Sequence, residues 1–187
     1  MTEKDPSYSD ENLIWIDMEM TGLQPEVNRV LEVACIITDK NLNILHRGPV
    51  VAVRQDKSVL DSMDAWNTQT HTASGLVGRC LSDEAVGEEE CAERFIEVFK
   101  RFVPPQKSPM CGNTIGQDRR FMARWLPRME AYFHYRSIDV STIKELARRW
   151  SPKDVWVGTN PNKHQALYDI EDSINELKHY RKSVMKI

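Results

Sequence analysis

The chain has 187 residues, a formal net charge of −3 and four cysteines. This length indicates one domain, which we expect to span residues 1–187 with a polar tail at 1–12. A domain of this size hides roughly 70% of the surface that its unfolded chain exposes, so it does not need disulfides to be stable. The 28 acidic and 25 basic residues argue against a protein that grips long nucleic acid through many phosphate contacts. A short anionic substrate remains compatible, because bound divalent cations can supply the positive charge that the side chains lack.

The cysteines and the N-terminal segment indicate the compartment. The cysteines stand singly, without a C-x-x-C pair, at positions 35, 80, 91 and 111. This spacing favours reduced structural thiols over a zinc or redox site. Residues 1–12 lack the positive and then apolar layout of a signal peptide, and no segment approaches the ~20 apolar residues of a membrane span. We therefore expect a soluble cytoplasmic protein with no membrane association.

The first elements in the chain are predicted to be strands. Residues 13–20 alternate between an apolar face and a face that carries Asp17 and Glu19. Two β-branched runs, 29–38 and 44–54, are separated by a polar turn and predict a hairpin beside the first strand. The chain is therefore expected to open with a three-strand meander.

Helices and short strands alternate in the rest of the sequence. The spacing of apolar residues and helix-stop signals predicts, in order, a helix at 88–103, a strand near 110, a helix at 116–129, a strand at 135–140, a helix at 141–150, a loop at 151–163 and a final helix. A Ser/Thr cap with Glu145 nearby is expected to start the helix at 141. The pattern predicts an α/β domain in which helices flank a mixed central sheet.

Asp17 and Glu19 are the first candidate metal ligands. Both side chains leave the same face of a strand that otherwise looks buried. Two like charges in such a place are costly unless a cation lies between them. Taken alone, a D-x-E pair is more often the solvated face of an edge strand, and that interpretation remains open at this point.

Two further acidic positions follow in the second half of the chain. Asp118 precedes Phe121 and Met122 by three and four residues, which places it at the start of a core-facing helical stripe. The alternative is an acid that only complements the helix dipole. His164 and Asp169 are five residues apart, or about 140° around a helix, so they converge only if His164 lies in the preceding loop. Otherwise His164 is a polar residue at the helix entry.

Together these residues supply the parts of a two-metal hydrolytic site. The four carboxylates carry a charge of −4, which two divalent cations balance. Hard cations such as Mg²⁺ and Mn²⁺ prefer oxygen ligands, and a pair about 3.5–4 Å apart stabilises both the attacking and the leaving oxygen of a phosphodiester. A neutral imidazole at His164 would deprotonate the attacking water.

Three motifs resemble those of the oligoribonuclease family, which belongs to the DEDDh exonucleases and has a ribonuclease H-like fold. They are WIDMEMTGL at 15–23, GNTIGQDRR at 112–120 and H-x-A-x-x-D at 164–169. Shorter stretches at 64–67, 70–76, 131–136 and 139–142 extend the similarity over nearly the whole chain. Members of this family often carry a second aspartate where this chain has Tyr168, a position that the third motif does not require.

The resemblance implies an activity and a substrate. It implies a 3′-to-5′ exoribonuclease that degrades short single-stranded RNAs, down to dinucleotides, to nucleoside 5′-monophosphates. In that case Asp17, Glu19, Asp118 and Asp169 hold the two ions and His164 is the general base.

The resemblance also assigns residues that bind the substrate. Leu23 and Trp66 would pack on the bases, and Tyr135 from the second subunit of a homodimer would close the pocket. Stacking of this kind is worth about 1–3 kcal/mol per base, so two such surfaces together with two cations can hold a dinucleotide without a basic groove. By the same resemblance, a polar cap over the 5′ end, which would exclude longer chains, is expected from Thr114, Arg136, Ser141 and Thr142.

Two other functions remain open on the residues alone. An acidic site does not select the sugar, so a DNA-directed exonuclease of the proofreading type is the first alternative, and the 2′-hydroxyl distinguishes the two substrates. The second is a non-catalytic module that binds short oligonucleotides. The basic residues Lys144, Arg148 and Arg149 are expected to form a solvated helix face and not an RNA track.

Overall fold

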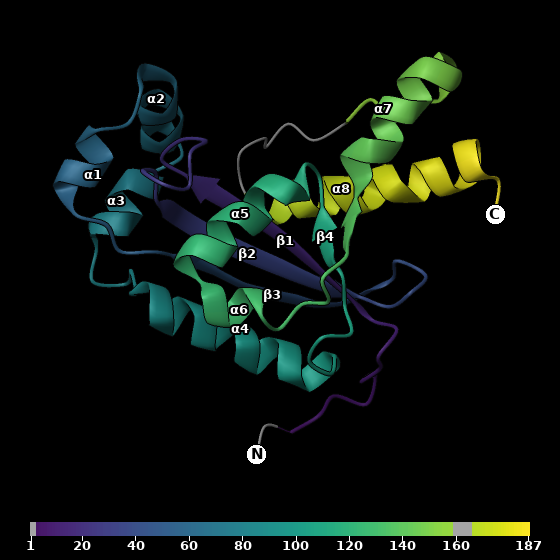
Figure 1. The fold of residues 1–187 in the computed structure, drawn as a ribbon, viewed down its shortest axis with the longest axis horizontal. Coiled ribbons are helices and arrows are strands. Elements are labelled where there is room, and N and C mark those ends of the chain that lie inside the picture. Colours follow the sequence, from purple (N-terminus) through teal and green to yellow (C-terminus); the bar gives the residue numbers. More distant parts are fainter. Residues whose placement is uncertain (1–2, 159–165) are drawn as a thin grey trace.

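A computed structural model describes residues 3–158 and 166–187, in which a five-stranded mixed sheet lies between helices (Figure 1). The strands are β1 (Leu13–Met20), β2 (Val30–Thr38), β3 (Ile44–Ala52), β4 (Met110–Gly112) and β5 (Ser137–Asp139). Their order is β3-β2-β1-β4-β5. The first three strands pair antiparallel, whereas β4 joins β1, and β5 joins β4, in parallel. The predicted meander and mixed sheet are confirmed.

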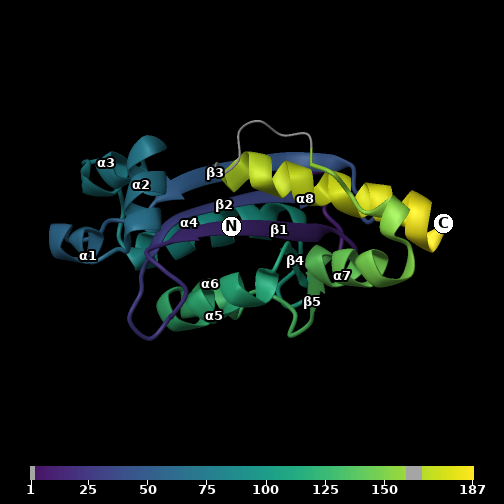
Figure 2. The ribbon, with the colours of Figure 1, turned by 90° about the horizontal axis from the view of Figure 1, so that it is seen from above.

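Helices cover both faces of this sheet (Figure 2). They are α1 (Lys57–Asp61), α2 (Ala65–Ala73), α3 (Leu76–Leu81), α4 (Glu88–Phe102), α5 (Ile115–Trp125), α6 (Pro127–Glu130), α7 (Val140–Trp150) and α8 (Ala166–Tyr180), with a 3₁₀ turn at Pro152–Asp154 and a π-helical turn at Arg181–Met185. Ile14 and Ile16 of β1 pack in one core cluster with residues of α4, α5 and α6. Trp15 packs on the opposite face with residues of α7 and α8. The alternation of β1 therefore decides that Asp17 and Glu19 emerge on the α8 face.

The segment between β3 and α4 forms three short helices that the apolar spacing does not predict. They lie together at one end of the sheet (Figure 1). Leu60, Leu76 and Cys80 pack there against Leu31 of β2 in a small separate cluster. Helix α2 buries only two side chains, both polar, so it has no apolar stripe for a sequence pattern to detect.

The helix predicted at 116–129 is wrong in its extent, because two helices occupy that region. Helix α5 ends at Trp125 and α6 begins at Pro127. Between them Leu126 has φ −130° and ψ 50°, outside the helical region. Proline disfavours the helical conformation of the residue before it and cannot donate a backbone hydrogen bond, so the chain turns here.

The elements around residue 140 also differ in detail. The strand predicted at 135–140 is limited to Ser137–Asp139. Helix α7 is capped by Asp139 and not by Ser or Thr, since the Asp139 carboxylate accepts a hydrogen bond from the Ser141 N–H. Glu145 pairs instead with Arg148 and Arg149 further along the helix.

The cysteines agree with the sequence prediction. Cys35, Cys80, Cys91 and Cys111 are buried and form no disulfide. Burial raises the pKa of each thiol, which keeps it protonated and unreactive. Among residues 3–158 and 166–187, no helix has both the length and the apolar character needed to cross a bilayer.

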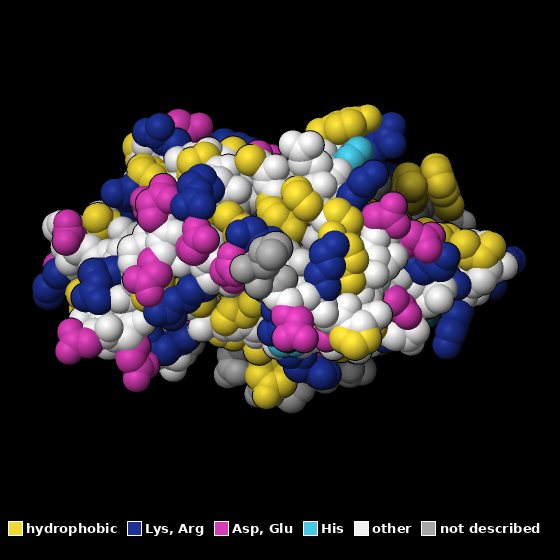
Figure 3. Space-filling view, turned by 90° about the horizontal axis from the view of Figure 1, so that it is seen from below, with side chains coloured by type: hydrophobic (Ala, Val, Ile, Leu, Met, Phe, Trp, Pro, Cys, Tyr) yellow, Lys and Arg dark blue, Asp and Glu magenta, His cyan; other side chains and the backbone are white. Residues whose placement is uncertain are grey.

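Charges of both signs are interspersed on the surface that includes α4 (Figure 3). Several of them form exposed ion pairs, such as Arg94 with Glu90 and Arg128 with Glu93. The described residues of this face therefore present no continuous basic band of the kind that follows a long nucleic-acid backbone.

Candidate metal centre and substrate-binding surface

Asp17, Glu19 and Asp169 converge on one point. One carboxylate oxygen from each lies within 4.8 Å of the other two. Asp17 and Glu19 share a face of β1, and Asp169 comes from the first turns of α8. Packing of Trp15 with Ile170 and Ile174 holds this helix against the strand. The solvated-edge interpretation of Asp17 and Glu19 is therefore wrong, since β1 is the central strand.

Asp118 reaches the same region from α5. Its buried carboxylate accepts a hydrogen bond from the backbone N–H of Met18, which lies between Asp17 and Glu19 on β1. The end of β4, which leads into α5, approaches β1 very closely, because a Cβ at Gly112 would lie 2.9 Å from the Ile16 carbonyl oxygen. Asp118 also interacts electrostatically with Asp17 and Glu19. Asp118 thus lies beside the three converging acids and interacts with them, although it is not one of the group whose oxygens lie within 4.8 Å of one another; we call the four residues together the acidic cluster.

The electrostatics of the cluster favour bound cations. Burial raises the pKa of Asp17 well above its usual range, and the charges of Asp118, Glu19 and Asp169 raise it further. Burial also raises the pKa of Glu19 to about 7 and that of Asp118 to about 8. Carboxylates crowded in this way are ionised together only when positive charge is added among them. The donor set is all oxygen, which fits hard divalent cations.

His71 of α2 lies beside the acidic cluster, and the sequence did not predict a functional role for it. Its side chain is buried, and Nε2 lies 3.0 Å from the Met20 carbonyl oxygen. A carbonyl only accepts, so Nε2 carries the proton and donates it. The other ring nitrogen, Nδ1, lies 4.0 Å from Glu19 Oε2. His71 therefore fixes α2 to the end of β1 next to Glu19, a contact between segments 51 residues apart that no local pattern reveals.

Leu23 and Trp66 line one hollow next to the end of β1. The hollow has a volume of about 630 Å³ and includes Thr21, Asn28 and Asn67 in its walls. Leu23 is 75% exposed and Trp66 is 60% exposed, which leaves two apolar surfaces open to a ligand. The structure thus brings together the two residues expected to pack on bases.

Each side of this hollow is anchored to an element that carries or contacts the acidic cluster. Gln117, which precedes Asp118, donates a 2.5 Å hydrogen bond from Nε2 to the Leu23 carbonyl oxygen. Trp66 stands in the first turn of α2, the helix that His71 attaches to β1. These contacts therefore hold Leu23 and Trp66 in a defined position relative to the carboxylates.

Asp139 gathers two of the residues expected at the polar cap. Its Oδ1 atom accepts from the Thr114 N–H at 2.9 Å and from the Ser141 hydroxyl at 2.6 Å. Thr114 has a left-handed backbone with φ 54°, and the hydrogen bond that its N–H donates to Asp139 stabilises that conformation. Thr142 follows Ser141 and is exposed on α7.

Tyr135 and Arg136 occupy the segment that leads into β5. Arg119 supports this segment by donating to the carbonyl oxygens of His134, Tyr135 and Arg136. The Tyr135 side chain is 72% exposed, and the Arg136 guanidinium lies 5.2 Å from its ring centroid. His164, the expected base, lies outside the described residues.

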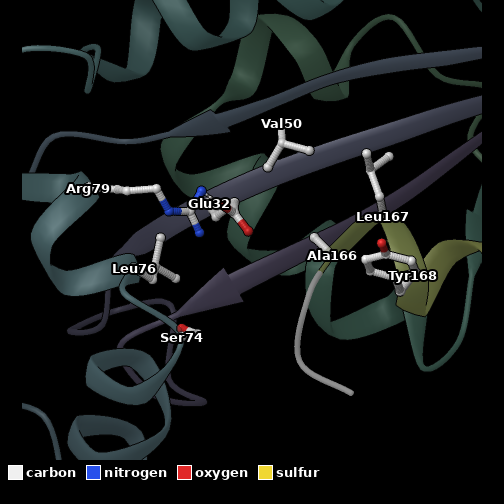
Figure 4. Close-up of a pocket in the computed structure, with 8 residues that line it drawn as sticks. All are labelled: Glu32, Val50, Ser74, Leu76, Arg79, Ala166, Leu167 and Tyr168. Atoms are coloured by element: carbon white, nitrogen blue, oxygen red, sulfur yellow. Dashed lines mark hydrogen bonds and ion pairs between the residues drawn. The ribbon is translucent and has the colours of Figure 1, made fainter. Parts of the chain in front are cut away.

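A second hollow of about 370 Å³ lies over β2, between α3 and the start of α8 (Figure 4). Glu32 forms part of its wall and pairs with Glu19 in the register of β1 and β2. Arg79 reaches Glu32 from α3 and forms an ion pair with it. Tyr168 lines the opposite side and is partly exposed. Arg79 thus compensates an additional buried carboxylate next to the acidic cluster.

Comparison with known proteins identifies the relatives of this chain. The RNase T exonuclease family matches residues 14–177. An oligoribonuclease from Vibrio cholerae is 56% identical over 181 residues, which cover 97% of this chain and 99% of that protein. An oligoribonuclease from Halorhodospira halophila is 54% identical over 180 residues, covering 96% and 98%.

The fold is also similar to a solved structure. The zinc-bound Escherichia coli exonuclease I in complex with single-stranded DNA matches with a TM-score of 0.72 at 16% identity. The match covers 94% of this chain and 42% of that one, so this chain spans less than half of that protein. The likeness confirms the expected ribonuclease H-like fold.

Proposed function

The chain belongs to the oligoribonuclease family of exonucleases, and we propose that it acts as a 3′-to-5′ exoribonuclease on short RNAs. Its substrates are oligoribonucleotides down to dinucleotides, and its products are nucleoside 5′-monophosphates. One observation carries the proposal: Asp17, Glu19 and Asp169 converge, with Asp118 beside them, in a chain that matches its relatives over almost their whole length.

The proposed chemistry divides among the residues of the cluster. Asp17, Glu19, Asp118 and Asp169 hold two divalent cations, Mg²⁺ or Mn²⁺. When bound, these ions supply stabilisation of the attacking and leaving oxygens. His164 takes a proton from the attacking water, as the resemblance implies. The raised pKa values of Glu19 and Asp118 support the assignment of cations to this place.

The substrate would lie across the surface formed by the first hollow. Leu23 and Trp66 stack on the bases, because each offers an exposed apolar surface beside the acidic cluster. Thr114, Arg136, Ser141 and Thr142 form the polar cap that limits substrate length. The support from Asp139 beneath Thr114 and Ser141 favours this assignment.

We also propose a homodimer in which Tyr135 of each chain completes the site of the other. Tyr135 and Trp150 are both more than 70% exposed, at 72% and 74%, which is unusual for large aromatic side chains. Sedimentation should show a dimer, and Tyr135→Ala should lower activity. A fully active monomer would contradict this part of the proposal. The four free, buried cysteines support a reducing compartment, and hence the cytoplasm.

The activity is tested by product analysis with RNAs of two to ten nucleotides, with and without EDTA. We expect nucleoside 5′-monophosphates, fastest turnover of the shortest chains and no product with EDTA. A DNA dinucleotide turned over with equal or better kcat/KM than its RNA counterpart would favour the DNA-directed alternative. Tight Mg²⁺-dependent binding without any monophosphate product would favour the non-catalytic module.

Two variants test the roles of single residues. Asp169→Asn should abolish activity and weaken Mn²⁺ binding, whereas Asp172→Asn on the same helix serves as the matched control. His164→Ala should slow hydrolysis by about 10²–10⁴ and leave Mn²⁺ binding nearly unchanged. A loss smaller than threefold at saturating RNA would exclude His164 as the base.

A further inference from the structure

Glu176 is a buried carboxylate on the helix that carries Asp169. Its side chain is only 1% exposed. The two residues are seven positions apart in α8, which is almost two turns, so they lie on the same side of the helix. A buried carboxylate is costly unless hydrogen bonds and an opposite charge compensate it.

The partners of Glu176 come from three parts of the chain. Its Oε2 atom accepts from Asn113 Nδ2 at 2.9 Å, and its Oε1 atom accepts from the Tyr180 hydroxyl at 2.9 Å. Lys144 Nζ lies 3.0 Å from Oε1 and compensates the charge. Lys144 therefore differs from the solvated residue expected from the sequence, whereas Arg148 and Arg149 are exposed as predicted.

Asn113 links Glu176 to the turn between β4 and α5. Its Nδ2 group also lies 3.1 Å from Ser173 Oγ, and Ser173 donates to the Asp169 backbone carbonyl at 2.9 Å. The next residue, Thr114, has the left-handed conformation from which α5 begins. Asn113 thus joins the helix of Asp118 to the helix of Asp169.

We propose that Glu176 is a positioning residue for the metal centre, because its bond to Asn113 fixes the start of α5 against α8. This inference rests on the proposed assignment of Asp118 and Asp169 as ligands. The side chains that would hold the cations must be placed to within about 0.5 Å, and this precision depends on the side chains behind them. Glu176 acts through Asn113 and contributes to metal affinity without touching the metals.

The test compares Glu176→Leu with Tyr180→Phe. A leucine side chain is close in size to glutamate and has no acceptor oxygen, so it removes the hydrogen bond from Asn113. Tyr180→Phe removes the bond at Oε1 and leaves the bond from Asn113, which makes it the control for lost stability. Mn²⁺ binding is measured by electron paramagnetic resonance without substrate, and kcat and KM are measured with a diribonucleotide.

We expect Glu176→Leu to weaken Mn²⁺ binding and lower kcat, each by about tenfold, with KM changed less than twofold. Tyr180→Phe should change Mn²⁺ affinity by less than twofold, although both variants unfold at lower urea concentrations. Equal effects of the two variants on Mn²⁺ affinity would overturn the proposal, and so would wild-type affinity in Glu176→Leu.

A second variant covers the case in which Glu176→Leu does not fold. Asn113→Ala removes the same link from the other side and should also weaken Mn²⁺ binding about tenfold, while wild-type affinity would contradict the inference. Failure of the wild-type protein to bind Mn²⁺ would contradict the metal centre itself, whereas an active wild type with an equally active Glu176→Leu would contradict only the role of Glu176.

Discussion

Adding Mn²⁺ to the metal-free protein should release protons from the carboxyl groups of the acidic cluster. Burial raises the pKa of Glu19 to about 7 and that of Asp118 to about 8, so both groups are partly protonated near neutral pH. A divalent cation binds the ionised form of a carboxylate, and binding therefore displaces these protons.

The magnitude follows from the two pKa values. At pH 7 a group with a pKa of about 7 holds about half a proton, and one with a pKa of about 8 holds about 0.9, so the two release about 1.4 protons per chain. The raised pKa of Asp17 adds to this amount. At pH 9 Glu19 and Asp118 together hold only about 0.1 proton, so their contribution should nearly vanish.

Isothermal titration calorimetry measures this quantity. Mn²⁺ is titrated at one pH into the protein in buffers that differ in ionisation enthalpy, and the slope of observed heat against that enthalpy gives the number of protons released. Asp118→Asn should lower the release at pH 7 by at least about 0.9 of a proton, because it removes this carboxyl group and also the charge that raises the pKa of Asp17. Release near zero at pH 7, or release that grows from pH 7 to pH 9, would refute the reasoning from buried, crowded carboxyl groups.

Three further predictions concern stability. Folding raises the pKa of Asp17, Glu19 and Asp118 above the unfolded values, so the metal-free protein should lose stability as the pH rises from about 4 to about 8. Mn²⁺ should therefore raise Tm most at the upper end of this range. A Tm that increases with pH over this range in the absence of metal would contradict the prediction. Gly112→Ala should lower the free energy of unfolding, measured in urea, by about 1–3 kcal/mol, because the new Cβ would contact the Ile16 carbonyl oxygen. Gly116→Ala is the control and should be neutral or stabilising, since its Cβ would meet nothing within 4 Å. Similar effects at both glycines would contradict the close approach of Gly112 to β1. Arg119→Ala should lower the urea midpoint far more than Arg120→Ala, because Arg119 donates hydrogen bonds to three backbone carbonyl oxygens and forms an ion pair with Glu130. Equal midpoints for the two variants would show that these interactions do not stabilise the fold.

The sequence by itself determined most of the strands and longer helices, and the face of β1 that carries the side chains of Asp17 and Glu19. Alternation along residues 13–20 correctly placed Asp17 and Glu19 opposite the apolar face of β1. The helical stripe at 88–103 matches α4, which ends at Phe102. Apolar residues that recur every two positions in a strand, or every 3.6 in a helix, show which face of that element is buried. This pattern lies within one short segment, so the sequence alone reveals it.

The positions of residues that belong to no apolar repeat became known only from the tertiary structure. Helices α1–α3 are short and bury few apolar side chains, so their positions depend on contacts with β2. The contact of His71 with the end of β1 and the link from Glu176 to Asn113 join segments 51 and 63 residues apart. Such pairs form only when the sheet and its helices have packed, and the energy that selects them comes from contacts absent in any isolated segment. The sequence could therefore name the four acids, whereas the packing of β1, α5 and α8 brings Asp17, Glu19 and Asp169 together with Asp118 beside them.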